Sequence, residues 1–269
     1  MGSVGKSPIS GTLERWKSIT HQEIVAESTR SDILDHVTSV IHSLTWEDRW
    51  SQTVIDDARS GRPNFRCLLS WMALEMCPSS YLEIGVRRGF SMAVLASRAQ
   101  RASIVGIDRW IRGYAGSPNP GPRFVRKEIE KTGHSGDLHL VKGDSHRVLR
   151  TLLAGKRTGF SRLRKVVVPR DFDLITVDGD HSLLGAYADL TDAFQLCAIG
   201  GAVIMDDIAA QQPLTDAAMQ VFRKELGPDP HSWGSLLGVW RAAQSQFPQF
   251  RYFEFSDEPP GTALALRIG

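Results

Sequence analysis

The sequence predicts an α/β fold in which helices cover both faces of a mostly parallel sheet. After residue 78, short apolar runs alternate five times with segments of helical period, which is typical of parallel strands joined by crossover helices. The last two apolar runs are separated only by a turn and predict an antiparallel pair at the end of the chain. With 269 residues, the chain is long enough for one or two domains.

The composition is that of a globular protein and argues against several classes. Hydrophobic residues make up 42% and charged residues 23%, which disfavours a disordered or fibrous chain. The net charge of +2 does not favour a protein that binds nucleic acid through phosphate contacts. The 3 cysteines lack zinc-finger spacing and fit a reducing compartment. Because no apolar run has membrane-spanning length and the start lacks a signal-peptide core, we expect a cytoplasmic protein with neither a membrane nor a nucleic-acid partner.

Each strand and helix is predicted from its apolar period. Strands are predicted at 81–84, 103–107, 138–141, 172–177, 202–205, 250–255 and 262–268. Helices between them are predicted at 91–100, 123–131, 146–154, 183–197 and 214–226. Gly200-Gly201 is expected to form a turn before the fifth strand, and the basic segment 155–170 is expected to be a surface insertion.

A helical N-terminal extension, residues 1–78, is predicted to precede the sheet-forming part, residues 79–269. Residues 1–12 are rich in Gly and Ser and predict a mobile tail. Apolar residues recur at helical spacing over 13–44, and 65–76 predict another helix. We expect the extension to act as a cap or as a dimerisation element, so a homo-oligomer is one expected state.

The loop after the first predicted strand is where an open parallel sheet would bind a ligand. Gly85 and Gly89, four residues apart, allow a tight turn and close approach of a ligand to the backbone. Their spacing differs from the G-x-G-x-x-G of dinucleotide folds, so a pyrophosphate cradle is disfavoured. Glu83 at the strand end suits a cation or an amino group. Taken alone, this pattern favours a structural turn.

Two further loops change that interpretation. Asp108 ends the second predicted strand, where an acidic side chain can accept hydrogen bonds from both hydroxyls of a ribose. Asp144 and Ser145 follow the third strand and could contact an adenine edge. A ribose, an adenine and a positively charged amino-acid end, without phosphates, describe S-adenosylmethionine.

Over residues 81–207 the sequence resembles the class I S-adenosylmethionine-dependent methyltransferases. The segments similar to the first three motifs of that family are YLEIGVRRGFS, VGID and VKGDS. The resemblance implies a Rossmann-like, doubly wound sheet of seven strands whose last strand is antiparallel. It implies cofactor-binding roles for Glu83, Gly85, Gly89, Ser91, Asp108, Asp144, Ser145 and Asp178. These motifs do not identify the methyl acceptor.

Carboxylates gather at the ends of the fourth and fifth predicted strands. Asp178 and Asp180 follow the fourth strand together with His181, and Asp206 and Asp207 end the fifth. Neighbouring parallel strands lie about 4.8 Å apart, so these side chains share one edge if the two strands are adjacent. Neither segment contains a basic residue that would relieve their repulsion. A divalent cation would relieve it, and oxygen ligands favour Mg²⁺, Mn²⁺ or Ca²⁺ over zinc, whereas capping of the next helix is the structural alternative.

The segment DGDHS and the later pair Asp206-Asp207 resemble the metal-dependent small-molecule O-methyltransferases of the catechol and macrolide-sugar types. The resemblance implies that Asp178, Asp206 and Asp207 hold Mg²⁺. In the macrolide-sugar type, the residue matching His181 is the proposed base. In other sugar O-methyltransferases that role falls to the residue matching Asp180, so the choice between the two stays open.

The sequence therefore predicts a Mg²⁺-dependent O-methyltransferase that acts on a small hydroxylated metabolite, with a natural-product sugar as one acceptor. The cation would orient two vicinal oxygens and lower the pKa of the reacting hydroxyl, and His181 could take its proton. Three alternatives stay open: a metal-independent N-methyltransferase whose Asp cluster binds an amine, a non-catalytic cofactor-binding protein of the same fold, and a hydroxylase.

Other candidate side chains are assigned mainly to packing. Trp233, Trp240 and Phe247 lie before the final strand pair and could line an acceptor pocket, but packing of a helix on the sheet is favoured. Trp46 and Trp50 pose the same choice. The scattered histidines near the third strand are predicted to have surface or packing roles, and they are His134, His139 and His146.

Overall fold

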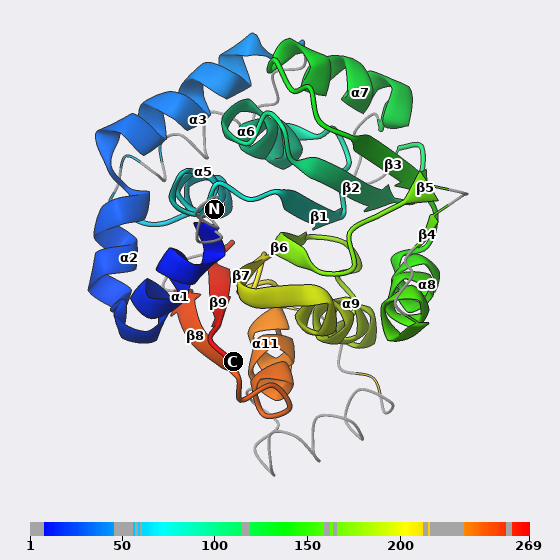
Figure 1. Ribbon diagram of the computed structural model, residues 1–269. Coiled ribbons are helices and arrows are strands. Elements are labelled where there is room, and N and C mark those ends of the chain that lie inside the picture. Colours follow the sequence, from blue (N-terminus) through cyan, green and yellow to red (C-terminus); the bar gives the residue numbers. More distant parts are fainter. Residues whose placement is uncertain are drawn as a thin grey trace, which may run out of the picture.

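The computed structural model describes residues 8–45, 61–113, 119–158, 162–163, 166–211, 234–256 and 260–269, with the single residues 56, 59 and 215. Its strands are β1 (Ser80–Ile84), β2 (Ser103–Asp108), β3 (Leu138–Lys142), β4 (Arg162–Leu163), β5 (Val166–Val167), β6 (Phe172–Val177), β7 (Cys197–Asp206), β8 (Phe250–Phe255) and β9 (Thr262–Arg267). Seven of them form one sheet in the order β3-β2-β1-β6-β7-β9-β8, shown in Figure 1.

The pairing of the strands confirms the predicted seven-stranded sheet. Strands β3, β2, β1, β6 and β7 run parallel, whereas β9 is antiparallel to both of its neighbours, β7 and β8. Strands β6 and β7 are adjacent, as the predicted gathering of carboxylates at the ends of the fourth and fifth strands requires. The carboxyl ends of five neighbouring strands therefore lie along one edge, and their loops can contact a common ligand.

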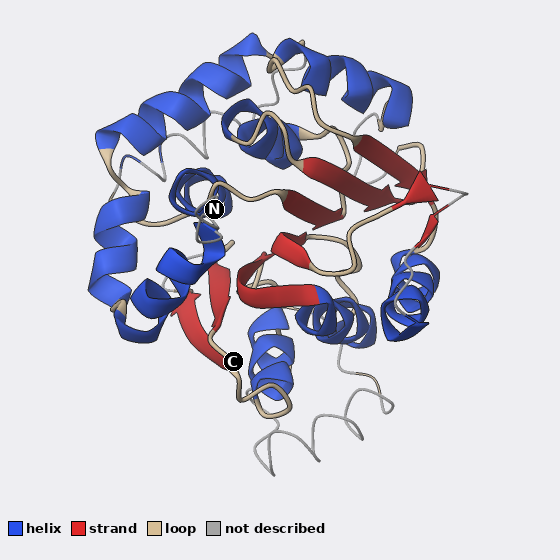
Figure 2. Cartoon of the chain, in the orientation of Figure 1, coloured by secondary structure: helices blue, strands red, loops and turns tan. Residues whose placement is uncertain are grey.

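Helices cover both faces of the sheet (Figure 2). They are α1 (Pro8–Ser18), α2 (His21–Ser28), α3 (Ser31–Ser43), α5 (Phe65–Met76), α6 (Phe90–Arg98), α7 (Pro122–Lys131), α8 (Ser145–Thr158), α9 (Leu183–Leu196) and α11 (Leu236–Gln244). Within the described part of the chain, no helix has the length and apolar character needed to cross a membrane.

Two hydrophobic cores flank the sheet, one on each face. The first contains residues of α1, α2, α3, α5, α6 and α7, and the second contains residues of α8, α9 and α11. Tyr81 enters the first core and Leu82 the second, because successive strand residues point to opposite faces. Trp240 and Phe247 pack against Phe194 of α9, at 6.0 and 5.1 Å between ring centres, which confirms their predicted packing role.

The N-terminal extension packs into the first core through buried side chains. Trp16 of α1 is fully buried, and its indole Nε1 donates to Gly200 O of β7 at 2.9 Å. At the far end of α3, Thr45 N donates to a carboxylate oxygen of the buried Glu128 in α7 at 2.7 Å. These contacts fix α1 and α3 against elements of the sheet-forming part.

Several element boundaries differ from those predicted. The helical stretch over 13–44 is divided into three helices, and the first break falls where Thr20 caps α2 in a reciprocal pair with Glu23. Residues 8–12, predicted as part of a mobile tail, belong to α1. Gly200-Gly201 lies inside the longer strand β7 instead of preceding it.

The basic segment 155–170 also has more structure than predicted. Helix α8 extends to Thr158, and β4 and β5 form a small antiparallel pair. The predicted helix 214–226 falls almost entirely outside the described residues. Trp46, Trp50 and Trp233 also lie outside the described residues.

A histidine joins α3 to two helices of the first core. His36 Nδ1 lies 2.8 Å from Ser70 Oγ of α5, and Nε2 lies 2.7 Å from Ser97 Oγ of α6. Arg98 Nε also donates to Ser70 Oγ at 3.0 Å. Burial, with a smaller contribution from the Arg98 charge, lowers the pKa of His36 from 6.5 to about 4.

Acidification is expected to weaken the attachment of α3. Because the pKa of His36 is lower in the folded than in the unfolded chain, unfolding takes up a proton between pH 6.5 and about 4. The free energy of unfolding should therefore fall as the pH drops through this window. Above pH 6.5, His36 should contribute no pH dependence to it. Chemical denaturation of wild type and His36→Gln from pH 7 to 4 measures this, and equal pH slopes would contradict it.

Candidate active site

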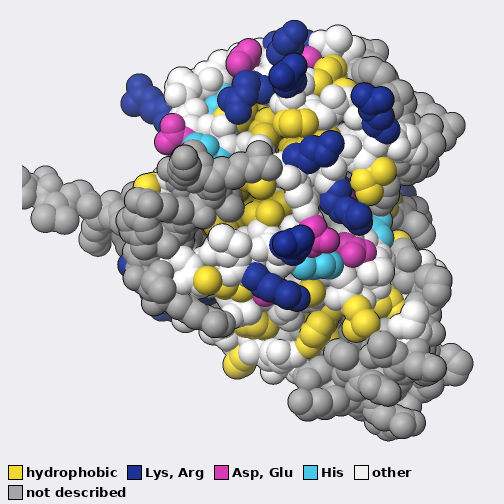
Figure 3. Space-filling view, turned by 90° about the vertical axis from the view of Figure 1, so that its right-hand side faces the viewer, with side chains coloured by type: hydrophobic (Ala, Val, Ile, Leu, Met, Phe, Trp, Pro, Cys, Tyr) yellow, Lys and Arg dark blue, Asp and Glu magenta, His cyan; other side chains and the backbone are white. Residues whose placement is uncertain are grey.

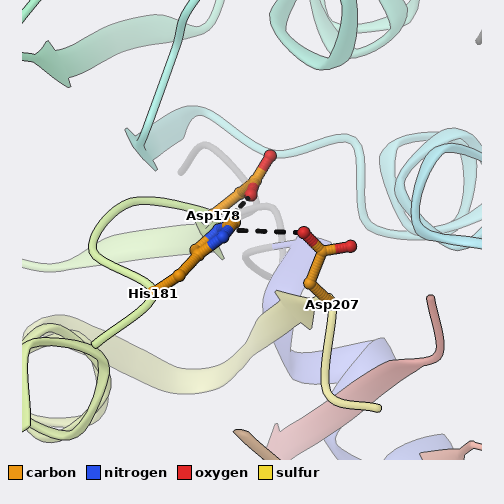
Figure 4. Close-up of side chains that lie close together, drawn as sticks. All are labelled: Asp178, His181 and Asp207. Carbon is orange, nitrogen blue, oxygen red and sulfur yellow. Dashed lines mark hydrogen bonds and ion pairs between the residues drawn. The ribbon is translucent and has the colours of Figure 1, made fainter. Parts of the chain in front are cut away.

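Three side chains converge at the carboxyl ends of β6 and β7, as Figure 4 shows. Among the described residues, Asp178, His181 and Asp207 each offer one ligand atom, and these atoms lie within 4.8 Å of one another. His181 Nε2 is 3.1 Å from Asp178 Oδ1 and 3.8 Å from Asp207 Oδ2. All three side chains are about one-third exposed, at 33%, 31% and 32%. We call these three residues the acidic triad.

The local backbone explains which residues enter the triad. Asp178 N donates to Ile84 O at 2.8 Å, so Asp178 continues the pairing of β6 with β1. Asp207 has a φ of 56°, a left-handed conformation that ends β7 and turns its side chain out of the strand alternation. Asp206, the other half of the predicted metal-binding pair, is not part of the triad. Whether Asp206 contacts a metal stays a prediction.

Asp180 has a different orientation from His181. Asp180 Oδ1 accepts a hydrogen bond from Ser182 N at 2.8 Å, at the start of α9. Its carboxyl group also lies against Gly185, where a Cβ would be only 2.2 Å from the carboxyl carbon. The N-cap of α9 is Ser182, whose hydroxyl accepts a hydrogen bond from Gly185 N, so neither Asp180 nor His181 occupies the capping position. His181 is the member of the pair that lies beside Asp178 and Asp207. The identity of the base stays a prediction.

The charges in this region perturb one another. The hydrogen bond to Asp178 raises the pKa of His181 to about 9, although burial opposes this. Burial and then the negative charge of Asp178 raise the pKa of Asp207, and the same two causes raise that of Asp206. The site therefore contains more carboxyl groups than the single imidazole can neutralise. A further positive charge would favour the ionised form of Asp206 and Asp207.

Arg66 is a contributor that sequence reasoning missed. It lies in the first turn of α5, in the N-terminal extension, and its charge lowers the pKa of Glu83, Asp206 and Asp207. Its Nε is buried and has no hydrogen-bond partner among the described residues. Figure 3 shows one face of the molecule, on which lysine and arginine side chains gather around acidic and histidine side chains. No local signal links residue 66 to strand ends that follow more than 100 residues later.

The donor set of the triad fits a divalent cation. Two carboxylates and one imidazole offer their ligand atoms within 4.8 Å of one another, and their side chains remain partly open to solvent. Carboxylate oxygens suit Mg²⁺ and Mn²⁺, whereas the imidazole nitrogen also suits softer transition metals. The mixed set differs from the predicted all-oxygen set because His181, and not Asp206, lies with Asp178 and Asp207.

Glu83 lies in a buried polar network at the end of β1. It accepts hydrogen bonds from Ser91 Oγ at 2.6 Å and Tyr81 Oη at 2.8 Å, and it is 1% exposed. Tyr81 Oη also lies 2.6 Å from Thr176 Oγ1 of β6. Burial raises the pKa of Glu83 to about 8, and the charge of Asp178 adds to this increase. A cationic group beside Glu83 would therefore favour the ionised form of this buried carboxyl group.

The two glycines of this loop are required by close contacts and by their backbone conformation. Gly85 has a φ of +90°, and a Cβ there would lie 1.8 Å from Asp178 O. Gly89 has a φ of +82° and caps α6, where a Cβ would lie 2.8 Å from Val125 Cγ1. Both positions therefore need glycine for the packing of the loop itself, whatever ligand it contacts.

Asp108 orders the loops after β1 and β2. One carboxylate oxygen accepts a hydrogen bond from Arg87 N at 2.7 Å, and the other accepts one from Trp110 N. The buried indole of Trp110 closes the arrangement by donating to Arg87 O at 2.9 Å. Sequence reasoning missed Trp110, because a single aromatic after a strand carries no distinctive pattern.

The loop after β3 lies beside these groups in the sheet order. Asp144 has a side chain that is 44% exposed, whereas Ser145 Oγ donates to the buried Asp189 of α9 at 3.1 Å. Gly143 N donates to Asp108 O at 2.9 Å. The predicted cofactor residues and the acidic triad thus follow one another along the carboxyl edge of β3, β2, β1, β6 and β7.

Residues 82–208 match the model of a methyltransferase domain family. This segment is therefore similar to a methyltransferase domain. It begins within β1 and ends just after β7, so it contains all of the predicted cofactor and metal residues. The resemblance to S-adenosylmethionine-dependent methyltransferases is thereby confirmed, whereas the match carries no information about a metal or an acceptor.

Three solved structures are similar to this chain at low sequence identity. A protein from Klebsiella pneumoniae, provisionally described as an O-methyltransferase, is 17% identical with a TM-score of 0.50, over 96% of this chain and 99% of that one. An O-methyltransferase from Bacillus cereus, in complex with S-adenosylhomocysteine, is 16% identical with a TM-score of 0.49, over 88% and 91%. TomG from Streptomyces achromogenes, an O-methyltransferase of tomaymycin synthesis in complex with S-adenosylmethionine, is 21% identical with a TM-score of 0.47, over 75% and 78%. No curated protein matches the chain.

Proposed function

We propose that this protein transfers the methyl group of S-adenosylmethionine to a hydroxyl group of a small metabolite, with the help of a divalent cation. The observation that carries the proposal is the acidic triad, which lies at the carboxyl edge of a methyltransferase domain. In such a domain the loops after β1, β2 and β3 are where the cofactor is expected. The triad on β6 and β7 is then in a position to contact the acceptor beside the cofactor.

The cofactor side of the proposal is supported by groups that suit a cationic amino acid joined to a nucleoside. Glu83, whose pKa is raised to about 8 by burial, would be stabilised in its charged form by an ammonium group. Asp108 retains free lone pairs on both oxygens for ribose hydroxyls, since each carboxylate oxygen can accept more than one hydrogen bond. When bound, S-adenosylmethionine supplies the activated methyl group, and the protein has to align the acceptor and make its oxygen nucleophilic.

Asp178 and Asp207 are the residues that would hold the cation, with His181 as a third contact or as the base. A bound divalent cation would orient two vicinal oxygens of the acceptor and lower the pKa of the reacting hydroxyl. Removal of the proton from the acceptor hydroxyl is then the task of this chain's own groups. His181 Nε2 lies 3.1 Å from Asp178, which fixes the ring at the edge where the acceptor hydroxyl would lie.

The N-terminal extension is proposed to cap the acceptor side of the site. Its helix α5 carries Arg66, whose charge acts on Asp206 and Asp207. A cap would exclude water from the acceptor and add residues that select it. A small hydroxylated metabolite, such as a natural-product sugar, is the acceptor class that suits the triad, and a cytoplasmic location stays an expectation.

Chelation is expected to abolish turnover without displacing the cofactor. With EDTA in excess, formation of S-adenosylhomocysteine from a panel of catechols and vicinal-diol sugars should stop, because the acceptor oxygens lose their cation. Calorimetric affinity for S-adenosylhomocysteine should stay the same, and excess Mg²⁺ should restore turnover. Full activity in the chelator would exclude the metal-dependent reaction.

A cationic amine is the second candidate for the group that the triad binds. The observation that favours it is the direct His181–Asp178 hydrogen bond at 3.1 Å, which partly compensates the carboxylates without a metal. Asp207 would then accept a hydrogen bond from the acceptor nitrogen, which must lose a proton to a base so that the lone pair of the neutral amine can attack the methyl group, and the reaction would be N-methylation. Turnover of amines that survives chelation would favour this candidate.

Cofactor affinity is expected to depend on Asp108. Asp108→Ala removes a charged acceptor for the ribose hydroxyls, and hydrogen bonds to charged groups are worth about 1.5–3 kcal/mol. Affinity for S-adenosylhomocysteine should therefore fall by roughly ten- to a hundredfold in calorimetry. Asp108→Asn is the matched control for loop order, because its amide oxygen can still accept a hydrogen bond from Arg87 N or Trp110 N. Unchanged affinity in a folded Asp108→Ala would remove Asp108 from the cofactor site.

A further inference from the structure

Asp189 of α9 is a fully buried carboxyl group that lies between two loops of the proposed site. Its exposed fraction is 0%. Asp189 Oδ2 accepts a hydrogen bond from Ser145 Oγ at 3.1 Å, at the start of α8, and another from Asp180 N at 3.5 Å. One oxygen atom therefore joins the loop after β3 to the loop after β6, residues 178–182.

The second oxygen of Asp189 faces a histidine in the first turn of α8. Asp189 Oδ1 accepts no hydrogen bond among the described residues, and it lies 3.5 Å from His146 Nε2. His146 Nε2 is in turn 3.2 Å from Gly185 O in the first turn of α9. Burial raises the pKa of Asp189 to about 6, while the Ser145 hydrogen bond and the His146 charge oppose this. The fold thus keeps an acid where its burial costs stability, and an apolar side chain could not form these contacts.

The loop after β6 packs directly on this carboxyl group. At Gly179 a Cβ would lie 3.0 Å from Asp189 Oδ2 and 2.9 Å from Ile84 Cγ2. No side chain separates the loop from Asp189 on that side. A displacement of Asp189 would therefore change the positions of Gly179 and Asp180, which lie between Asp178 and His181 in the chain.

We propose that Asp189 is a positioning residue that transmits cofactor binding at the loop after β3 to the catalytic loop 178–182. The inference rests on the proposed function, which assigns the adenine edge to Asp144 and Ser145 and the chemistry to Asp178 and His181. Ser145 and the Asp180 amide share one buried acceptor oxygen. A ligand that orders the first loop therefore lowers the entropic cost of ordering the second.

Hydrogen exchange of the two loops tests this coupling with S-adenosylhomocysteine as the probe. In wild type, saturating S-adenosylhomocysteine should slow amide exchange in peptides that cover 143–147 and 178–182, the latter by about fivefold or more. In Asp189→Leu only the first loop should respond, since the shared acceptor oxygen is lost. Asp192→Leu, the same substitution one turn later on α9 at a half-buried acid, is the matched control and should respond as wild type does.

A second variant keeps the test decisive if Asp189→Leu does not fold. Ser145→Ala removes the donor from the loop after β3 and leaves Asp189 in place, and it should also abolish slowing at 178–182. Slowing at 178–182 that equals wild type in either variant would overturn the proposal, and so would wild type that binds the probe with no slowing there. If calorimetry detects no binding to wild type, the cofactor assignment itself fails, and the coupling is overturned with it.

Discussion

His181→Ala is expected to lower kcat by about 10²–10⁴-fold, the usual contribution of a general base. The affinity for S-adenosylhomocysteine should stay unchanged, because no predicted cofactor contact involves the imidazole. The structural reason is the position of His181, whose Nε2 lies 3.1 Å from Asp178 and 3.8 Å from Asp207. Asp180, the other candidate base, has an oxygen engaged by Ser182 N at 2.8 Å.

The matched control for this variant is His134→Ala. His134 Nε2 lies 3.0 Å from Ala102 O, just before β2, and therefore at the opposite edge of the sheet. Steady-state kinetics on an accepted substrate should show a normal kcat for His134→Ala. Asp180→Asn should retain more activity than His181→Ala. A larger loss of kcat in Asp180→Asn would transfer the base role to Asp180.

Metal affinity is expected to collapse when either carboxylate of the acidic triad is neutralised. Asp178→Asn and Asp207→Asn keep the shape of the side chain but lose the charge that binds the cation. Their affinity for Mn²⁺ should fall by more than the about 10–100-fold that loss of an outer-shell partner costs. Titration of free Mn²⁺ by electron paramagnetic resonance measures this without an acceptor.

Asp206→Asn is the informative comparison for that series. Asp206 ends β7 and lies outside the triad, so its neutralisation should weaken Mn²⁺ binding less than that of Asp207. An equal loss would show that Asp206 is a ligand, as the family resemblance implies. Normal Mn²⁺ affinity in both Asp178→Asn and Asp207→Asn would contradict the assignment of the site.

Local patterns in the sequence are sufficient to predict most of this fold. The strand 172–177 and the helix 65–76 have the predicted bounds, because buried parallel strands form continuous apolar runs and helices have an apolar period. The gathering of Asp178 and Asp207 also follows from topology alone, since parallel neighbours end at the same edge. The split of 13–44 into three helices is harder to predict, because the Thr20 cap of α2 interrupts the helix without changing the apolar spacing of the sequence.

The residues that the sequence did not predict act through contacts between distant segments. Arg66 comes from α5 and acts on Asp206 and Asp207, which lie 140 and 141 positions later in the chain. Asp189 has the pattern of an ordinary helix residue, and only the structure places it under Ser145 and Asp180. The triad contains His181 and not Asp206. This arrangement depends on the left-handed backbone of Asp207, which a sequence pattern does not encode.

The most direct test of the central claim is the position of a bound cation. Crystals grown with Mn²⁺ and S-adenosylhomocysteine should show one anomalous peak per chain in contact with carboxylate oxygens of Asp178 and Asp207. The peak should lie beside the cofactor by-product, at the carboxyl edge of β6 and β7. A cofactor-bound structure at saturating Mn²⁺ with no peak between these two carboxylates would contradict a metal-dependent methyltransferase.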